Sequence, residues 1–214
     1  MVKLEEISSR ELSRVIDRVT TVVIPFGSIE YHGGHLPLGS DSLLADVVGQ
    51  EVAERLDAVL APTVRVGCAD PHMHGTGTLS VPVETLRTAA YHVASSLFAH
   101  GFRVIALIST HGGNLAALED AVRLLTEQHP EVVACAPRGD VGPAPGSHSG
   151  HWLTSVMLTV RPELVDLESA LPELEDELRG ATSEAGRENL ERFVSSIVRS
   201  VQEEARRRSS ENGA

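Results

Sequence analysis

Short apolar runs that alternate with helix-length segments constrain the fold of this chain more than any other feature. Residues 21–25, 58–66, 103–108 and 132–136 are predicted strands, and the first and third are apolar enough to be buried on both faces. Helices are predicted over 8–19, 41–56, 83–100, 115–128 and 151–160, and the first begins at Ser8 with Glu11 three residues later, the pattern of a capped helix start. This alternation predicts an α/β fold with a mostly parallel sheet and helices on both faces.

The composition fits an ordinary globular domain. The chain has 214 residues, of which 42% are hydrophobic and 22% are charged. We therefore expect one domain over residues 1–214, closed by a charged helix over about 183–214 whose last residues fray.

Charge and cysteine content exclude several partners. Lys and Arg number 18 against 30 Asp and Glu, and a net charge of −12 argues against nucleic acid and anionic membranes as partners. No apolar run reaches the roughly 18 residues of a membrane span, and the N-terminus lacks the apolar core of a secretory signal. Cys68 and Cys135 lie far apart without a CxxC motif, which predicts a reduced, cytoplasmic setting.

Polar residues that bind metals or move protons gather in the loops after the first, third and fourth predicted strands. Because ligands bind at the carboxyl ends of parallel strands, we expect these side chains to converge on one edge of the sheet, with Asp140 the exception. The group is Glu30, His32, His35, Asp41, His111, Asn114, Asp140, His148 and His151.

The segment 27–41 is the most informative of these loops. Glu30 and His32 are two apart, so in an extended strand end they point the same way, and Asp41 lies at a predicted helix start. A mixed set of imidazoles and carboxylates suits Zn²⁺, Mn²⁺ or Fe²⁺. The alternative is a loop with a capping aspartate and surface histidines. Residue spacing alone does not distinguish this loop from a metal site.

The other loops leave several roles open. Gly112 and Gly113 let the backbone approach a ligand, or they only permit a turn in which His111 caps the helix. His148 is a ligand or a general acid or base, since imidazole titrates near neutrality. His151 is a ligand or a residue at the start of a helix without a functional role. His72 lines a pocket or is exposed to solvent.

A serine hydrolase is excluded, because a G-x-S-x-G elbow needs serine at its centre and the nearest string, residues 146–150, has histidine there.

Together these motifs resemble the creatininase family of metal-dependent amidohydrolases over about residues 20–168. The strings that carry the resemblance are residues 27–38 with Asp41, 77–80, 111–114, 148–150 and 154–158. The resemblance implies a three-layer α/β/α sandwich and one or two divalent ions. It also implies hydrolysis of an unusual amide C–N bond, in a cyclic amide, a formamide or a small peptide. A homo-oligomer is expected, a hexamer among the options.

The resemblance also assigns roles to residues. Glu30, His32, Asp41 and His111 match the family's metal ligands, with Asp41 the bridging one, and His148 matches its proton shuttle. Pocket or additional ligand roles fall to a wider group, namely His151, His35, His72, Asn114, Gly112 and Gly113.

One position departs from the family pattern. The family commonly shows H-A-G-x-x-E-T-S, and Leu153 stands where its Glu contributes to the metal site. The second ion is then lost, or His151 replaces the ligand, or catalysis is lost. Creatininase also carries a Glu near the HGGN turn, where this chain has Gly113 and Asn114, so creatinine is not the expected substrate. The mycofactocin peptidase branch is nearer, since it has a His at the position of His151.

Overall fold

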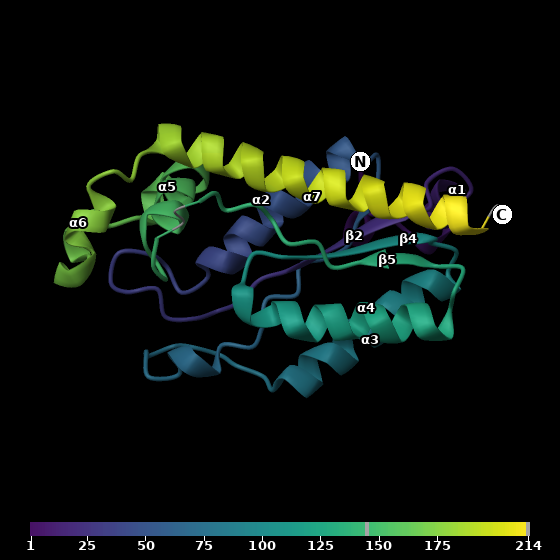
Figure 1. Ribbon diagram of the computed structural model, residues 1–214, viewed down its shortest axis with the longest axis horizontal. Helices are drawn as coiled ribbons and strands as arrows, with labels where there is room; N and C mark the ends of the chain where they lie inside the picture. The colour runs from purple at the N-terminus through teal and green to yellow at the C-terminus, as the bar shows by residue number, and fades with distance from the viewer. Residues whose placement is uncertain (144–145, 213–214) are drawn as a thin grey trace.

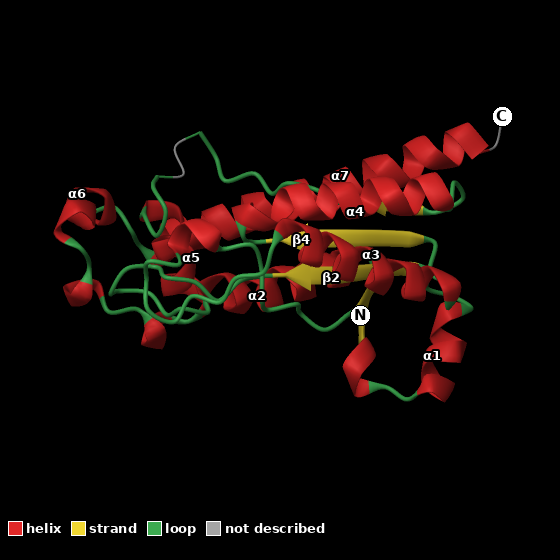
Figure 2. Ribbon diagram, turned by 90° about the horizontal axis from the view of Figure 1, so that it is seen from below, coloured by secondary structure: helices red, strands yellow, loops and turns green. Residues whose placement is uncertain are grey.

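The computed structural model describes residues 1–143 and 146–212. Its core is a five-stranded sheet in the order β1-β3-β2-β4-β5, in which every pairing is parallel. Figure 2 shows the two central strands, β2 and β4, side by side between helices. The predicted α/β class with a parallel sheet is therefore confirmed. The strands are β1 (Val2–Lys3), β2 (Thr21–Phe26), β3 (Val59–Leu60), β4 (Val104–Ser109) and β5 (Val133–Cys135).

Helices cover both faces of the sheet. Figure 1 shows α3 and α4 on one side, and α2 and α7 on the other, with α5 packed against α7. Each face of the sheet has its own hydrophobic core, because side chains alternate along β2. Val22 and Ile24 pack in the core under α3 and α4, and Val23 packs in the core under α2 and α7. The helices are α1 (Ser9–Ile16), α2 (Ser40–Arg55), α3 (Val83–Ala99), α4 (Leu115–Gln128), α5 (His151–Val160), α6 (Glu175–Leu178) and α7 (Ser183–Asn212).

The central strands determine where the functional loops lie. β2 and β4 pair in register from Thr21 opposite Val104 to Phe26 opposite Ser109. Because the two strands end side by side, the loop that follows β2 and the turn that follows β4 leave the sheet at the same edge.

The strand expected over 58–66 is wrong in its extent. β3 covers only Val59–Leu60, because Pro62 has no N–H to donate to a neighbouring strand. The chain returns to the sheet at Val64, whose N–H donates to Pro25 O at 2.9 Å, while Val64 O accepts from Gly27 N at 2.9 Å.

The chain ends differ from expectation in smaller ways. Ser8 caps α1 through reciprocal hydrogen bonds with Glu11, as predicted, but α1 ends at Ile16. The two-residue edge strand β1 and the short helical turns over 162–178 were not predicted, since each is too short to show periodicity. α7 covers Ser183–Asn212 of the charged helix expected over about 183–214, and residues 213–214, expected to fray, lie outside the described part.

Within the described residues, no helix is both long enough and apolar enough to span a membrane.

Gly186 allows α5 and α7 to pack closely. A Cβ atom at this position would collide with the backbone oxygen of Ser155 and with Oγ1 of Thr159. Since the start of α5 reaches the functional edge of the sheet, this contact supports the site described below.

We predict that Gly186→Ala destabilises the fold by about 1–3 kcal/mol, because overpacking against backbone outweighs the helix propensity that alanine adds. Urea unfolding followed by circular dichroism measures the change. Glu188→Ala, an exposed position on the same helix, is the control and should stay within about 0.5 kcal/mol. Equal or greater stability of Gly186→Ala would contradict the packing argument.

Candidate metal centre

Two carboxylates and two imidazoles meet at the edge of the sheet where β2 and β4 end. Glu30 and His32 come from the loop after β2, Asp41 from the first turn of α2, and His111 from the turn after β4. All four are buried, and Glu30 is only 1% exposed. The Nδ1 atom of His111 lies 3.1 Å from Glu30 Oε1 and 3.1 Å from Asp41 Oδ2.

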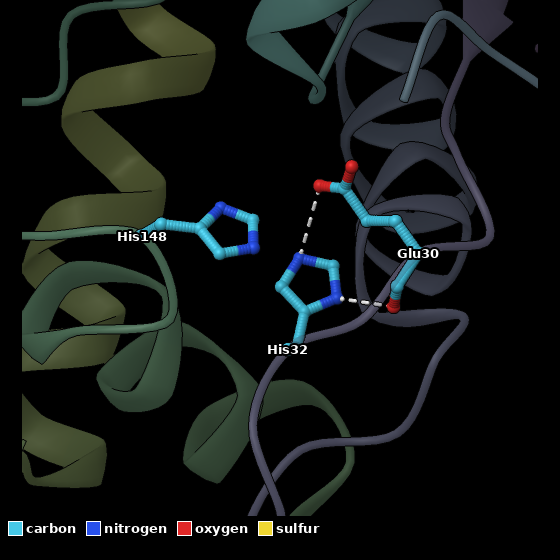
Figure 3. Close-up of side chains that lie close together, drawn as sticks. All are labelled: Glu30, His32 and His148. Atoms are coloured by element: carbon cyan, nitrogen blue, oxygen red, sulfur yellow. Dashed lines mark hydrogen bonds and ion pairs between the residues drawn. The ribbon is translucent and has the colours of Figure 1, made fainter. Parts of the chain in front are cut away.

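His32 completes this cluster. Its Nε2 atom lies 3.4 Å from Glu30 Oε1 and 3.6 Å from Asp41 Oδ1. Figure 3 shows His148 beside the His32 ring, and the two ring centroids are 4.8 Å apart. Potential ligand atoms form two sets, and within each set all atoms lie within 4.8 Å of one another. One set comes from Glu30, Asp41 and His111, and the other from Glu30, His32 and His148.

The cluster favours positive charge. Burial opposes a charge on His111, but hydrogen bonds and attraction from Asp41 and Glu30 outweigh it and raise the His111 pKa to about 10. The same carboxylates raise the pKa of His32 against its burial. Burial raises the pKa of Asp41, yet its contacts with His111 and His32 hold that pKa well below the ordinary value. Two buried carboxylates thus call for a cation, either protons on the histidines or a metal.

Outer hydrogen bonds orient the ligand atoms. His111 Nε2 donates to Cys68 O at 2.9 Å, which leaves Nδ1 free to face the carboxylates. His32 Nδ1 donates to Glu30 O at 3.1 Å, which leaves Nε2 facing them. Ser28 Oγ donates to Asp41 Oδ2 at 2.7 Å. Such supporting partners typically fix the tautomer and orientation of metal ligands.

One atom in particular fits a metal. Glu30 Oε2 is fully buried and has no hydrogen-bond partner among the described residues. An unpaired carboxylate oxygen in a protein interior is costly unless a cation balances it. The nitrogen and oxygen donors of the cluster are those that divalent ions such as zinc, manganese and iron accept. The site therefore fits a divalent metal.

Asn114 lies beside the cluster and holds three loops together. Its Oδ1 accepts from Cys68 N at 2.9 Å, and its Nδ2 donates to Gly27 O at 2.9 Å. These bonds occupy both ends of the amide. At Gly113 a side chain would collide with Cys68 O, whereas Gly112 is open and lines the adjacent pocket.

The remaining predicted residues divide into two groups, the first of which forms hydrogen bonds with other parts of the fold. His35 Nε2 lies 3.0 Å from Ser149 O and 3.1 Å from Thr154 Oγ1, so it links the β2 loop to α5. His151 Nε2 donates to Gly180 O at 2.8 Å. Asp140 Oδ1 accepts from Gly142 N in its own loop.

The second group lies against the cluster. His72 stacks on His148 with ring centroids 3.9 Å apart, and its Nε2 lies 4.0 Å from Glu30 Oε2. His148 Nε2 donates to Tyr31 O at 2.9 Å. The ring of His148 is thus placed between His32 and His72, at the exposed side of the buried carboxylates.

Glu177 holds the loop that carries His148, and the sequence offered no signal for it. Its carboxylate accepts hydrogen bonds from Ser147 N at 2.7 Å, Ser147 Oγ at 2.7 Å and His151 N at 3.0 Å. A Cβ atom at Gly146 or Gly150 would collide with Glu177 Oε1, so the position of the Glu177 carboxylate requires glycine at both positions. A contact between segments so far apart in the chain has no periodic pattern that would reveal it.

A pocket of about 330 Å³ opens beside the cluster. It combines the polar residues of the cluster with an apolar group from α5, α7 and the loop before α5. Its lining includes Glu30, His32, Asp41, His111, Gly112, Leu115, Arg138, Gly139, Val141, Ser147, His148, Trp152, Leu153 and Phe193.

Comparison with known proteins identifies the family. The Creatininase family model, described as creatinine amidohydrolase, matches residues 5–213. The chain belongs to the creatininase family. The resemblance that the motifs predicted is therefore confirmed, and it places the chain among hydrolases that act on C–N bonds.

Among curated relatives, the mycofactocin precursor peptide peptidase of Mycobacterium ulcerans is 33% identical over 173 residues, covering 76% of this chain and 67% of the relative. The peptidase of Mycolicibacterium smegmatis is 34% identical, covering 73% of this chain and 63% of the relative. Creatinine amidohydrolase of Pseudomonas putida is 27% identical, and the match covers 73% of this chain and 70% of that relative. The chain thus spans about two thirds of the length of the curated peptidases that it matches.

Solved structures agree on the fold. A crystal structure of creatinine amidohydrolase superposes with a TM-score of 0.83 at 24% identity, covering 95% of this chain and 97% of that chain. A creatininase structure with Mn superposes with a TM-score of 0.84 at 23% identity, and the match covers 95% of this chain and 98% of that chain. The three-layer α/β/α sandwich implied by the resemblance is confirmed.

We predict that Glu177→Ala releases the 146–151 turn. The substitution removes the acceptor of the Ser147 and His151 amides, and hydrogen bonds to a charged group contribute roughly 1.5–3 kcal/mol, so exchange of both amides should accelerate about 10-fold or more. Hydrogen–deuterium exchange followed by NMR measures this. Glu173→Ala, an exposed neighbour, is the matched control, and unchanged exchange at both amides would show that Glu177 does not hold the turn.

Proposed function

We propose that this protein is a metal-dependent amidohydrolase that cleaves a non-standard amide C–N bond, in a cyclic amide, a formamide or a small peptide. The observation that carries the proposal is the buried group of Glu30, Asp41 and His111, which includes a carboxylate oxygen without a partner. Family membership supports the same chemistry.

Glu30, His32, Asp41 and His111 would hold one or two divalent ions, of zinc, manganese or iron. Asp41 is suited to bridge two ions, because its two oxygens face different histidines, Oδ1 toward His32 and Oδ2 toward His111. A bound divalent ion supplies a Lewis acid that makes water nucleophilic near neutral pH.

His148 is proposed to move the proton. Its Nε2 donates to Tyr31 O, so Nδ1 is the atom left to take a proton from water and return it to the departing nitrogen. Stacking against His72 and His32 limits the rotation of the ring, and Glu177 fixes the turn on which it sits. Backbone N–H groups near Gly112 and Gly113 are proposed to stabilise the oxyanion, since Gly112 lines the pocket.

A second candidate follows from Leu153. Leu153 lines the pocket where the resemblance implies a carboxylate, which supports a catalytically weakened or non-catalytic member, and a peptidase of the mycofactocin type is the other alternative. The 33% identity to a mycofactocin precursor peptide peptidase favours the peptidase.

The setting of the enzyme is also part of the proposal. We infer a homo-oligomer, with a hexamer among the options, that works in the cytoplasm on a small amide or peptide and not on nucleic acid or membranes. The free thiols of Cys68 and Cys135 support a reducing compartment, and the acidic composition argues against polyanionic partners.

We predict that His111→Ala loses most of its bound metal, because it removes an imidazole nitrogen that lies 3.1 Å from both carboxylates. Elemental analysis after metal loading and desalting measures ions per chain. His92→Ala, which removes an exposed histidine on α3, is the matched control and should keep the wild-type content. Full metal content in His111→Ala would refute its role as a ligand.

We predict that His148→Ala keeps its metal and loses turnover by about 10²–10⁴-fold, the usual contribution of a positioned acid or base. Release of free amine from a panel of cyclic amides, formamides and short peptides measures the rate, and elemental analysis controls for the metal. An unaffected rate would remove His148 from the mechanism.

A further inference from the structure

Ser149 directly follows His148, and its backbone is strained. Its φ angle is +64°, in the left-handed region that a residue with a side chain rarely occupies. Apart from glycines, Asp57 is the only other described residue with a positive φ. Ser149 lines the pocket beside the metal centre and is only 3% exposed, so contacts inside the protein must hold this conformation.

Two side chains supply those contacts, and both donate to the carbonyl of Ser149. His35 Nε2 lies 3.0 Å from Ser149 O, and Thr154 Oγ1 donates to the same oxygen at 3.0 Å. Because a carbonyl oxygen can only accept, Nε2 is the nitrogen of His35 that carries a proton. The same nitrogen lies 3.1 Å from Thr154 Oγ1. The orientation of the Ser149 peptide is therefore fixed by two donors that are buried with it.

His35 is itself held from the other side. It is buried, and its carbonyl accepts a hydrogen bond from Asp166 N at 2.9 Å. At Gly34 a Cβ atom would collide with Ser169 O, so the 166–169 segment packs directly against the backbone that carries His35. His35 therefore presents a donor of fixed position to the Ser149 carbonyl.

These contacts bear on His148 because it shares a peptide bond with Ser149. The His148 ring stacks between the rings of His32 and His72, with centroids 4.8 and 3.9 Å away. If the Ser149 peptide turned to relieve its strain, the His148 ring would swing out of this stack and away from Glu30. A group that acts on a reacting atom loses much of its effect when it is displaced by as little as about 1 Å.

We propose that His35 is a positioning residue for His148: together with Thr154, it holds Ser149 in the left-handed conformation that keeps the His148 ring beside Glu30. The proposal rests on the proposed function, because it takes His148 as the group that moves the proton. In this role His35 touches neither the substrate nor the metal. Its loss therefore affects turnover, and leaves the metal content and the binding of substrate in place.

The variant His35→Phe removes the donor and keeps a flat ring. We expect kcat to fall about 10-fold or more, with KM and the metal content unchanged, because only the orientation of His148 changes. The assay uses the cyclic amide, formamide or short peptide that the wild-type enzyme cleaves fastest. His129→Phe, at the opposite end of α4 from the cluster, is the matched control and should keep the wild-type kcat. If His35→Phe does not fold, Thr154→Val removes the second donor, with an expected fall in kcat of about 3-fold or more.

Ser149 provides a sharper test, because glycine adopts a positive φ without strain and alanine does not. In the His35→Phe background, Ser149→Gly should recover kcat by about 3-fold or more, and Ser149→Ala should give no recovery. Both substitutions remove the hydroxyl, so the difference between them reports on the backbone alone. If His35 only stabilised the fold, the two substitutions would not differ in this way.

NMR spectroscopy gives a readout that does not depend on activity. In the full chain loaded with zinc, the stacked rings of His32 and His72 should displace the ring-proton signals of His148 from the position of free histidine. In His35→Phe these signals should move back toward that position. The signals are assigned by their absence from the spectrum of His148→Ala.

An unchanged kcat in a folded His35→Phe variant would overturn the proposal, as would unchanged His148 signals or equal recovery with Ser149→Gly and Ser149→Ala. If the wild-type enzyme cleaves no member of the panel, the proposed function fails. The His148 signals then still decide whether His35 positions the ring, so the two failures are distinguishable.

Discussion

Two carboxylates buried within reach of each other are the constraint on which the functional edge of this protein depends. Glu30 and Asp41 are almost fully shielded from water, and carboxylates in that position must be balanced by positive charge. His32 and His111 face them, each with its other ring nitrogen donating to a backbone carbonyl. The surrounding loops are thus arranged around two buried negative charges, which protonated histidines or a bound cation can balance.

The fold supplies the rigidity that such a cluster needs. The six-residue pairing of β2 and β4 brings two turns to the same edge, and Asn114 then bonds the β2 loop to the 67–82 loop. Gly67 and Gly113 accept this close packing, because a side chain at either would collide with Asn114 or with Cys68 O. The geometry of the candidate metal centre is therefore fixed by contacts of the loop backbones, with each other and with Asn114.

The pocket beside the cluster has a different origin. α5 and α7 bring apolar side chains to its lining, and Glu177 accepts hydrogen bonds from the turn that carries His148. Leu153 lies at the junction, because it lines the pocket and packs against the core between the sheet and α7. Its aliphatic side chain makes this side of the pocket apolar.

Periodic and local features of this protein were readable from its sequence. The apolar runs around Val22 and Ile105 predicted the parallel sheet, Ser8 and Glu11 predicted a helix start, and the motif containing Glu30, His32 and Asp41 predicted the family, because each depends on neighbours along the chain. The tertiary structure alone decided that β3 stops after Leu60, that His151 bonds to Gly180, and that Glu177 anchors the loop beside His148. Those outcomes depend on contacts between distant segments, and only packing in three dimensions determines which groups are close enough to bond.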